Sequence, residues 1–167
     1  MPDIPDIRPA EVPRHLDLVR GLFRDYAASL GISLAFQDFE SELAELPGDY
    51  APPAGHILLA WQDGHAVGCV ALRPLEDGIC EMKRLYVSPS ARASGLGRRL
   101  AKRICTQARA AGYRRMRLDT LPSMTAAQSL YAAIGFRPIP AYCFNPIPGA
   151  IFLELDLSEP AKTKHAP

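Results

Sequence analysis

Three strand-like segments follow one another between His56 and Val87 with only short turns between them. "HILLAW", "AVGCVALRPL" and "ICEMKRLYV" are rich in β-branched, aromatic and other apolar residues, and "QDGH" and "EDG" between them carry the glycine and aspartate typical of turns. Connections this short join antiparallel strands. The segment therefore predicts a three-stranded antiparallel sheet, which constrains the fold more than any other part of the chain.

The hydrophobic period changes after this sheet. Apolar residues at helical spacing predict a helix from Gly95 to Ala111, followed by the strand "RRMRLDT" and a second helix from Met124 to Ile134. A strand reached through a helix normally lies parallel to its predecessor. We therefore predict an α/β domain (an α+β mixed sheet) with helices on the faces of the sheet.

The remaining segments complete one domain over residues 1–157. We predict a short first strand in "DIRPA", helices over residues 11–30 and 36–46, and two last strands over residues 136–142 and 151–157. A chain of 167 residues is the usual length of one domain. Residues 158–167 are rich in proline and lysine, and we expect this tail to be disordered.

Composition and charge exclude several kinds of partner and site. A net charge of +1 argues against nucleic acid, and the lack of a signal peptide or a long apolar stretch argues against a membrane. Cys69, Cys80, Cys105 and Cys143 lack metal-ligand or disulfide-framework spacing. We therefore expect free thiols, no metal site and a cytoplasmic location.

The stretch "RASGLGRRLA" joins a strand to the start of a helix. The first amides of a helix have no partner inside it, and glycines let an anion approach the backbone closely. No G-K-[ST] follows, so this is not a Walker A loop, and the third glycine of a dinucleotide motif is missing. The alternatives are a phosphate-binding loop and a tight turn that permits close packing.

Two longer motifs distinguish these alternatives. "VSPSARASGLG", from Val87 to Gly97, resembles motif A of the GNAT superfamily of N-acetyltransferases, and "AAQSLYAAIGF", from Ala126 to Phe136, resembles its second signature. Both stand in the family's order, and the resemblance extends from Ile7 to Leu157. It implies an acyl-CoA N-acyltransferase fold whose mixed sheet splays between two parallel strands.

The resemblance implies acetyl-CoA as co-substrate. Backbone amides from Arg92 to Gly97 would hold its pyrophosphate, and the backbone of Leu85 and Val87 would pair with the pantetheine arm. The amide of Leu85 would polarise the thioester carbonyl. The implied cofactor-binding residues are Leu85, Tyr86, Val87, Arg92, Ala93, Ser94, Gly95, Leu96, Gly97 and Arg98.

The resemblance also implies two catalytic residues. Tyr131 matches the tyrosine that protonates the departing thiolate, and its alternative is a packing role. Glu81 matches a general base of some members, and its alternatives are an ion pair with Lys83 or Arg73 and a water chain that takes the proton. Strand alternation places Glu81, Lys83 and Leu85 on one side, and Met82, Arg84 and Tyr86 on the other.

Two further positions carry predictions. The second signature often begins with an asparagine that contacts the pantetheine, and this chain has Met124 there. The contact is therefore either lost or supplied by Ser123 or Thr125. The helix after the glycine loop carries a basic face, which we interpret as solvent-exposed rather than as a nucleic-acid site. Its members are Arg98, Arg99, Lys102 and Arg103.

The acceptor site would lie opposite the cofactor, between the first helices and the last strands. Aromatic residues that could line it, or belong to the core, are Phe36, Phe39, Tyr50, Tyr142 and Phe144. Acidic residues that could attract a cationic amine are Glu40, Glu42, Glu45 and Asp49.

Three functions remain open from the sequence. The first is acetyl transfer to a primary amine of a small molecule or protein, by direct attack in a ternary complex. The second is an acetyl-CoA sensor of the same fold without turnover, and the third a nucleotide-binding domain of another fold. The resemblance also raises a homodimer as an expectation.

Overall fold

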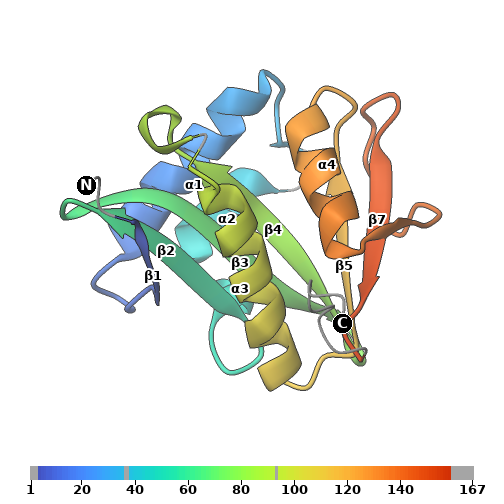
Figure 1. Ribbon diagram of the computed structural model, residues 1–167, viewed down its shortest axis with the longest axis horizontal. Coiled ribbons are helices and arrows are strands. Elements are labelled where there is room, and N and C mark those ends of the chain that lie inside the picture. The colour runs from blue at the N-terminus through green and yellow to red at the C-terminus, as the bar shows by residue number, and fades with distance from the viewer. Residues whose placement is uncertain (1–3, 36–37, 93, 159–167) are drawn as a thin grey trace, which may run out of the picture.

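The computed structural model describes residues 4–35, 38–92 and 94–158, and its centre is a mixed seven-stranded sheet (Figure 1). The strand order is β1-β2-β3-β4-β5-β7-β6, and the β4–β5 pair is parallel whereas the other neighbours are antiparallel. The strands are β1 (Asp6–Pro9), β2 (His56–Gln62), β3 (His65–Glu76), β4 (Ile79–Val87), β5 (Arg115–Thr120), β6 (Arg137–Pro138) and β7 (Ile151–Asp156). The predicted meander and its parallel neighbour are therefore confirmed.

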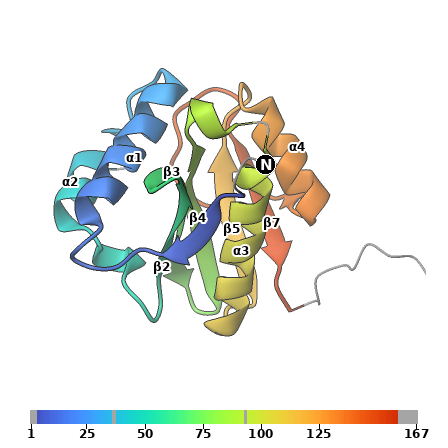
Figure 2. The same ribbon diagram turned by 60° about the vertical axis from the view of Figure 1, so that its left-hand side comes forward.

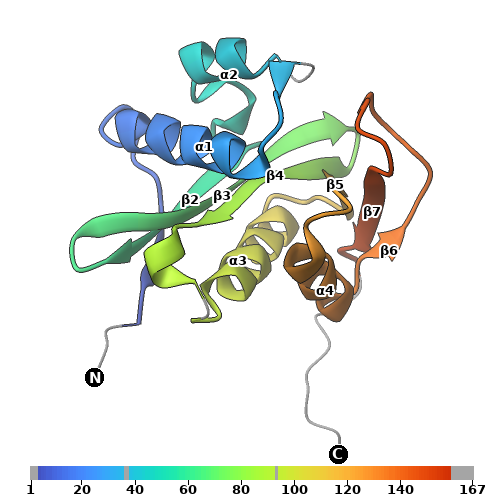
Figure 3. The same cartoon turned by 90° about the horizontal axis from the view of Figure 1, so that it is seen from above.

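Helices cover both faces of this sheet. Figures 2 and 3 show α1 (Leu16–Leu30) and α2 (Phe39–Glu45) on one face, and α3 (Leu96–Ala110) and α4 (Thr125–Ile134) on the other. Two short 3₁₀ helices, η2 (Gly48–Tyr50) and η3 (Pro89–Ala91), precede β2 and α3. Among the described residues, no helix is long and apolar enough to cross a bilayer.

Each face of the sheet has its own apolar core, because alternate strand residues point to opposite sides. Leu58, Val70 and Leu72 join Leu100 and Ile104 of α3 on one face. On the other face, residues such as Leu59 and Cys69 pack under Phe23 of α1 and Leu43 of α2. The two cores fix the helices against the sheet, with α1 and α3 packed on opposite faces of β4, where the predicted site lies.

Gly68 of β3 lets α3 approach the sheet closely. A Cβ at this position would lie 3.0 Å from the Tyr86 carbonyl oxygen and 3.1 Å from Leu100 Cδ1. We expect Gly68→Ala to lower the free energy of unfolding by about 1–3 kcal/mol, since overpacking forces backbone shifts. Urea unfolding measures this, with Gly21→Ala in α1 as control. Nothing lies within 4 Å of a Cβ at Gly21, so equal effects of the two changes would contradict the close approach.

Two predicted elements differ from the structure. The predicted strand over residues 136–142 shrinks to β6, because Pro138 and Pro140 have no N–H for a ladder. The first helix begins at Leu16 instead of Glu11, since the residue before Pro13 is disfavoured in a helix. The predicted tail lies outside the described residues from residue 159 on, as does Phe36.

Candidate active site

β4 and β5 separate shortly after they begin. Their register contains Ile79 with Arg115, Cys80 with Met116 and Glu81 with Arg117, and no later pair of these two fully described strands. Beyond Glu81, the edge of β4 that faces β5 therefore has no strand partner. Such an edge can accept an extended chain through backbone hydrogen bonds.

A β-bulge interrupts β4 within this unpaired part. Lys83 is registered with Ala71 and Tyr86 with Cys69, so two residues of β4 stand opposite Val70 alone. The first of them, Arg84, has a φ of +63°. The predicted alternation is therefore wrong beyond Lys83: Arg84 contacts Glu42 of α2, on the side of Glu81, and Leu85 packs into the core beneath α3.

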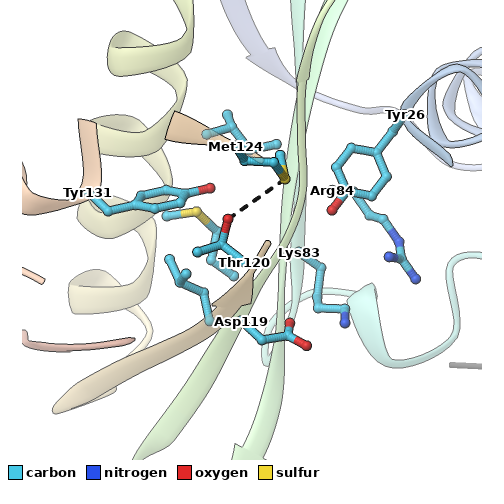
Figure 4. A pocket seen from close by; sticks show the side chains of 10 residues that line it. Tyr26, Lys83, Arg84, Asp119, Thr120, Met124 and Tyr131 are labelled. Carbon is cyan, nitrogen blue, oxygen red and sulfur yellow. Dashed lines mark hydrogen bonds between the residues drawn. The ribbon is translucent and has the colours of Figure 1, made fainter. Parts of the chain in front are cut away.

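The opening between β4 and β5 forms a pocket (Figure 4). Leu85, Met124 and Tyr131 line it, so the structure brings three of the positions singled out in the sequence together. The lining also includes polar or charged residues that the sequence did not single out for this site: Tyr26, Lys83, Arg84, Asp119 and Thr120. The sequence contained two indications of these pocket residues: charged residues within the interior strand "CEMKRLYV", and polar residues at the end of "RMRLDT".

Tyr131 reaches the pocket from α4. Its ring packs edge-on against Phe136 with 5.6 Å between centroids, and the residue is 6% exposed. Figure 4 shows its hydroxyl directed into the opening, while Tyr26 of α1 approaches from the other side. Burial raises the pKa of Tyr131 well above its ordinary value. The phenol is therefore a proton donor at neutral pH.

Met124 occupies the position where the sequence motif often has asparagine. Its thioether sulfur accepts a hydrogen bond from Thr120 Oγ1 at 3.7 Å (Figure 4). The position still lines the pocket, but with a flexible apolar group and a weak acceptor.

Glu81 lies at the point where β4 and β5 separate, but it is not among the residues that line the pocket. Its Oε1 accepts a hydrogen bond from Arg73 Nε at 3.0 Å, and its Oε2 accepts one from the Tyr142 hydroxyl at 2.7 Å. Burial raises the pKa of Glu81, but the charge of Lys83, the Tyr142 hydrogen bond and Arg73 lower it by more, so the pKa lies below its ordinary value. The ion pair with Arg73, one of the predicted alternatives, is therefore present.

The glycine loop leads directly into α3. Gly95 is the N-cap residue, with a φ of +77° that favours glycine. The first intrahelical hydrogen bond here runs from the Arg99 amide to the Gly95 carbonyl at 3.1 Å, so the amides of Leu96, Gly97 and Arg98 precede it. Among the other predicted loop residues, Arg92 donates to the Val87 carbonyl at 2.9 Å and Ser94 to the Ala91 carbonyl at 2.6 Å, while Ala93 lies outside the described residues.

The basic face of α3 lies at the surface, in agreement with the sequence interpretation: Lys102 and Arg103 are exposed, and Arg98 and Arg99 are half-buried. Arg99 donates to the Pro5 carbonyl at 2.8 Å and Arg103 to the Ile7 carbonyl at 3.3 Å. These two arginines hold β1 and the residues before it against α3.

Several residues predicted for the acceptor site have other partners. Glu42 binds Arg84, and Glu40 binds Arg24 at 3.3 Å. Phe39 and Tyr50 are buried in the core under α1 and α2, whereas Phe144 is 73% exposed. Two of the four acidic groups are thus engaged in ion pairs, and the other charged residues that line the pocket, besides Arg84, are Lys83 and Asp119.

A sequence model of the acetyltransferase (GNAT) family matches residues 19–136, which include β4, the glycine loop and Tyr131. The chain belongs to this family. Family membership makes it an acetyltransferase, and acetyl-CoA is the co-substrate that the family uses. The expected acyl-CoA N-acyltransferase fold is confirmed.

Curated relatives agree with this assignment. The chain is 39% identical over 155 residues to an uncharacterized N-acetyltransferase of Schizosaccharomyces pombe, covering 92% of this chain and 95% of that protein. It is 38% identical over 109 residues to an IAA acetyltransferase of Azospirillum brasilense, covering 64% of this chain and 71% of the relative.

Solved structures show the same fold. An acyl-CoA N-acyltransferase of Klebsiella pneumoniae, 29% identical, matches with a TM-score of 0.70 over 92% of this chain and 98% of its own. An acetyltransferase of Salmonella typhimurium, solved with its cofactor acetyl-CoA, matches with a TM-score of 0.69 at 20% identity, over 98% of this chain and all of its own.

Proposed function

We propose that this protein transfers the acetyl group of acetyl-CoA to a primary amine, by direct attack in a ternary complex. One observation carries the proposal: β4 has an unpaired edge beyond Glu81, at the opening into which Tyr131 points, and the chain leads from the end of β4 to amides at the start of α3 that precede its first intrahelical hydrogen bond. An extended pantetheine arm fits such an edge, and a pyrophosphate fits such amides. The thioester would then lie beside Tyr131.

The chemistry divides between the backbone and side chains. The Leu85 amide donates to the thioester carbonyl, so that negative charge on the oxygen is stabilised while the amine attacks. The C–N bond forms, the C–S bond breaks, and the nitrogen loses a proton to a base. Tyr131 donates its proton to the thiolate and recovers one from solvent. The raised pKa of Tyr131 keeps the phenol protonated until then.

A small-molecule amine is the acceptor that we favour over a protein amine. A relative named N-acetylaspartate synthetase, from Rattus norvegicus and 30% identical over 138 residues, supports this class. The lining of the pocket by Lys83 and Asp119 suits a small polar molecule rather than an apolar one.

An acceptor screen tests the proposal. Purified protein is incubated with acetyl-CoA and a panel of amines that includes amino acids, polyamines and peptides, and acetylated products are detected by mass. Thiol release gives the rate. Tight binding of acetyl-CoA without any product would instead support the alternative of an acetyl-CoA sensor. The family fold excludes the other alternative, a nucleotide-binding domain of another fold.

Two carboxylates stand near the site where the amine loses its proton. Glu81 has both oxygens bound and a lowered pKa, which weakens it as a base. Asp119 lines the pocket itself, with Oδ2 held by Asn145 Nδ2 at 3.0 Å.

We expect Asp119→Asn to lower kcat about 10²-fold or more and Glu81→Gln to lower it less, because Asp119 lines the pocket beside Tyr131 and Glu81 does not. Steady-state rates with an amine from the screen measure this. The reverse order would assign the base to Glu81, and two small effects would assign it to a water chain.

A further inference from the structure

Arg84 has an unusual backbone conformation for its residue type. Its φ of +63° lies in the left-handed region, and it sits in the β4 bulge directly before Leu85. A non-glycine residue adopts this conformation at the expense of about 1 kcal/mol or more, so surrounding contacts must hold it there. Glycine would adopt it without strain.

The contacts that hold Arg84 come from α1 and α2. Its Nε and Nη2 donate to the two carboxylate oxygens of Glu42 at 3.0 and 3.2 Å. The guanidinium also lies over the rings of Tyr26 and Phe39, 5.6 and 5.1 Å from their centroids. With 1% of its side chain exposed, the arginine is fixed on several sides.

Glu42 is fixed in turn. The Tyr50 hydroxyl donates to Glu42 Oε1 at 2.8 Å, and Arg73 Nη1 lies 3.9 Å from the same oxygen. The carboxylate therefore has a defined orientation, and α2 and η2 set the position of the Arg84 side chain. A chain of contacts thus runs from the α2 region to the backbone at the bulge.

Stability alone is a weak explanation for this ion pair. A buried pair loses much of its attraction to desolvation, and well-packed apolar residues are often as stable. What a bidentate pair adds is a fixed geometry. Here the pair fixes the position of Arg84, and the next residue, Leu85, lines the opening between β4 and β5.

We propose that the Glu42–Arg84 ion pair is a positioning device that holds the β4 bulge, so that the Leu85 amide is directed at the thioester carbonyl of acetyl-CoA. The inference rests on the proposed function for its catalytic consequence. Its structural part, the control of the bulge by α2, stands on the contacts of the free protein.

Three variants test the proposal. Arg84→Gly keeps the positive φ without strain but removes the contacts to α2, and Glu42→Gln keeps the shape of the carboxylate but removes its charge. The control is Arg24→Ala, which removes the exposed Arg24–Glu40 pair between the same two helices. The melting temperature of each variant shows whether it is folded.

The first readout is amide hydrogen exchange in the protein without cofactor. We expect exchange at Lys83 and Tyr86, which flank the bulge, to become about 10–100-fold faster in Arg84→Gly, with smaller changes in α3. The Arg24→Ala control should exchange as the original protein does. Unchanged exchange around the bulge in Arg84→Gly would overturn the proposal, whether or not the protein is an enzyme.

The second readout is the preference for acetyl-CoA over CoA in calorimetry, since only acetyl-CoA offers a carbonyl to the Leu85 amide. We expect this preference to disappear in Arg84→Gly and to weaken in Glu42→Gln, while the affinity for CoA stays within about threefold. In turnover, kcat should fall about 10²-fold with little change in the KM for acetyl-CoA. If Arg84→Gly keeps both the preference for acetyl-CoA over CoA and the kcat of the unsubstituted protein, the proposal is overturned. If the unsubstituted protein itself shows no turnover, only the proposed function is rejected.

Discussion

Replacing Tyr131 with phenylalanine is expected to lower kcat about 10²–10⁴-fold, the usual contribution of a positioned general acid. The phenol is buried, its hydroxyl points into the β4–β5 opening, and burial raises its pKa. The ring itself packs against Phe136, and phenylalanine keeps that contact. The loss should therefore appear in kcat, with the KM for acetyl-CoA and the melting temperature little changed.

Tyr113→Phe is the matched control. The Tyr113 hydroxyl donates to the Ala54 carbonyl at 2.7 Å, away from the pocket lining, and its removal should leave kcat unchanged. A thioester with a more acidic thiol should suffer less from Tyr131→Phe, since its leaving group needs less protonation. A Tyr131→Phe enzyme with normal kcat would return this tyrosine to a packing role.

The second large effect is expected at the start of α3. A Cβ on Gly97 would lie 3.7 Å from Leu130 Cδ1 and 3.8 Å from Val87 Cγ2, which is ordinary contact, so alanine fits the fold. In the proposed complex, however, the pyrophosphate approaches the amides at this helix start, and we expect the added methyl to narrow that approach. Gly97→Ala should therefore weaken CoA binding about 10–100-fold, the effect of losing one hydrogen bond to a charged group, without lowering the free energy of unfolding.

Gly95→Ala tests the need for a positive φ at the N-cap of α3, separately from the loss of CoA binding expected in Gly97→Ala. No atom of the described residues lies within 4 Å of a Cβ at Gly95, but its φ is +77°. Alanine should therefore lower the free energy of unfolding by about 1–2 kcal/mol. Calorimetry with CoA and urea unfolding of both variants measure the two quantities. Normal CoA affinity in Gly97→Ala would contradict the placement of the pyrophosphate at this helix.

The sequence predicted those parts of the fold that local signals determine. Turn residues and hydrophobic period set the meander, the two helices of the second half and the parallel strand between them. It also predicted that Tyr131 and Leu85 would share a site, through the family resemblance. The glycine loop was located correctly, because strand, loop and helix start are all visible locally.

The bulge in β4 could not be predicted in the same way. Its form depends on Arg84 and Glu42, which are 42 residues apart in sequence and meet only when α2 packs on the sheet. Simple alternation therefore assigned Arg84 and Leu85 to the wrong sides. The available sign of a polar site was the stretch "EMKR", which places three charged residues within four positions of an otherwise apolar strand.

The short contact between β4 and β5 has a consequence for how relatives of this protein could change their donor. Three residue pairs join the two strands, and beyond them no backbone ladder between these strands sets the width of the opening. The packing of α3 against α4 then sets that width. One contact in this packing is between Leu130 of α4 and Gly97 of α3. Tolerance for a longer acyl chain can therefore evolve through helix packing, while every residue that touches the reacting thioester stays the same.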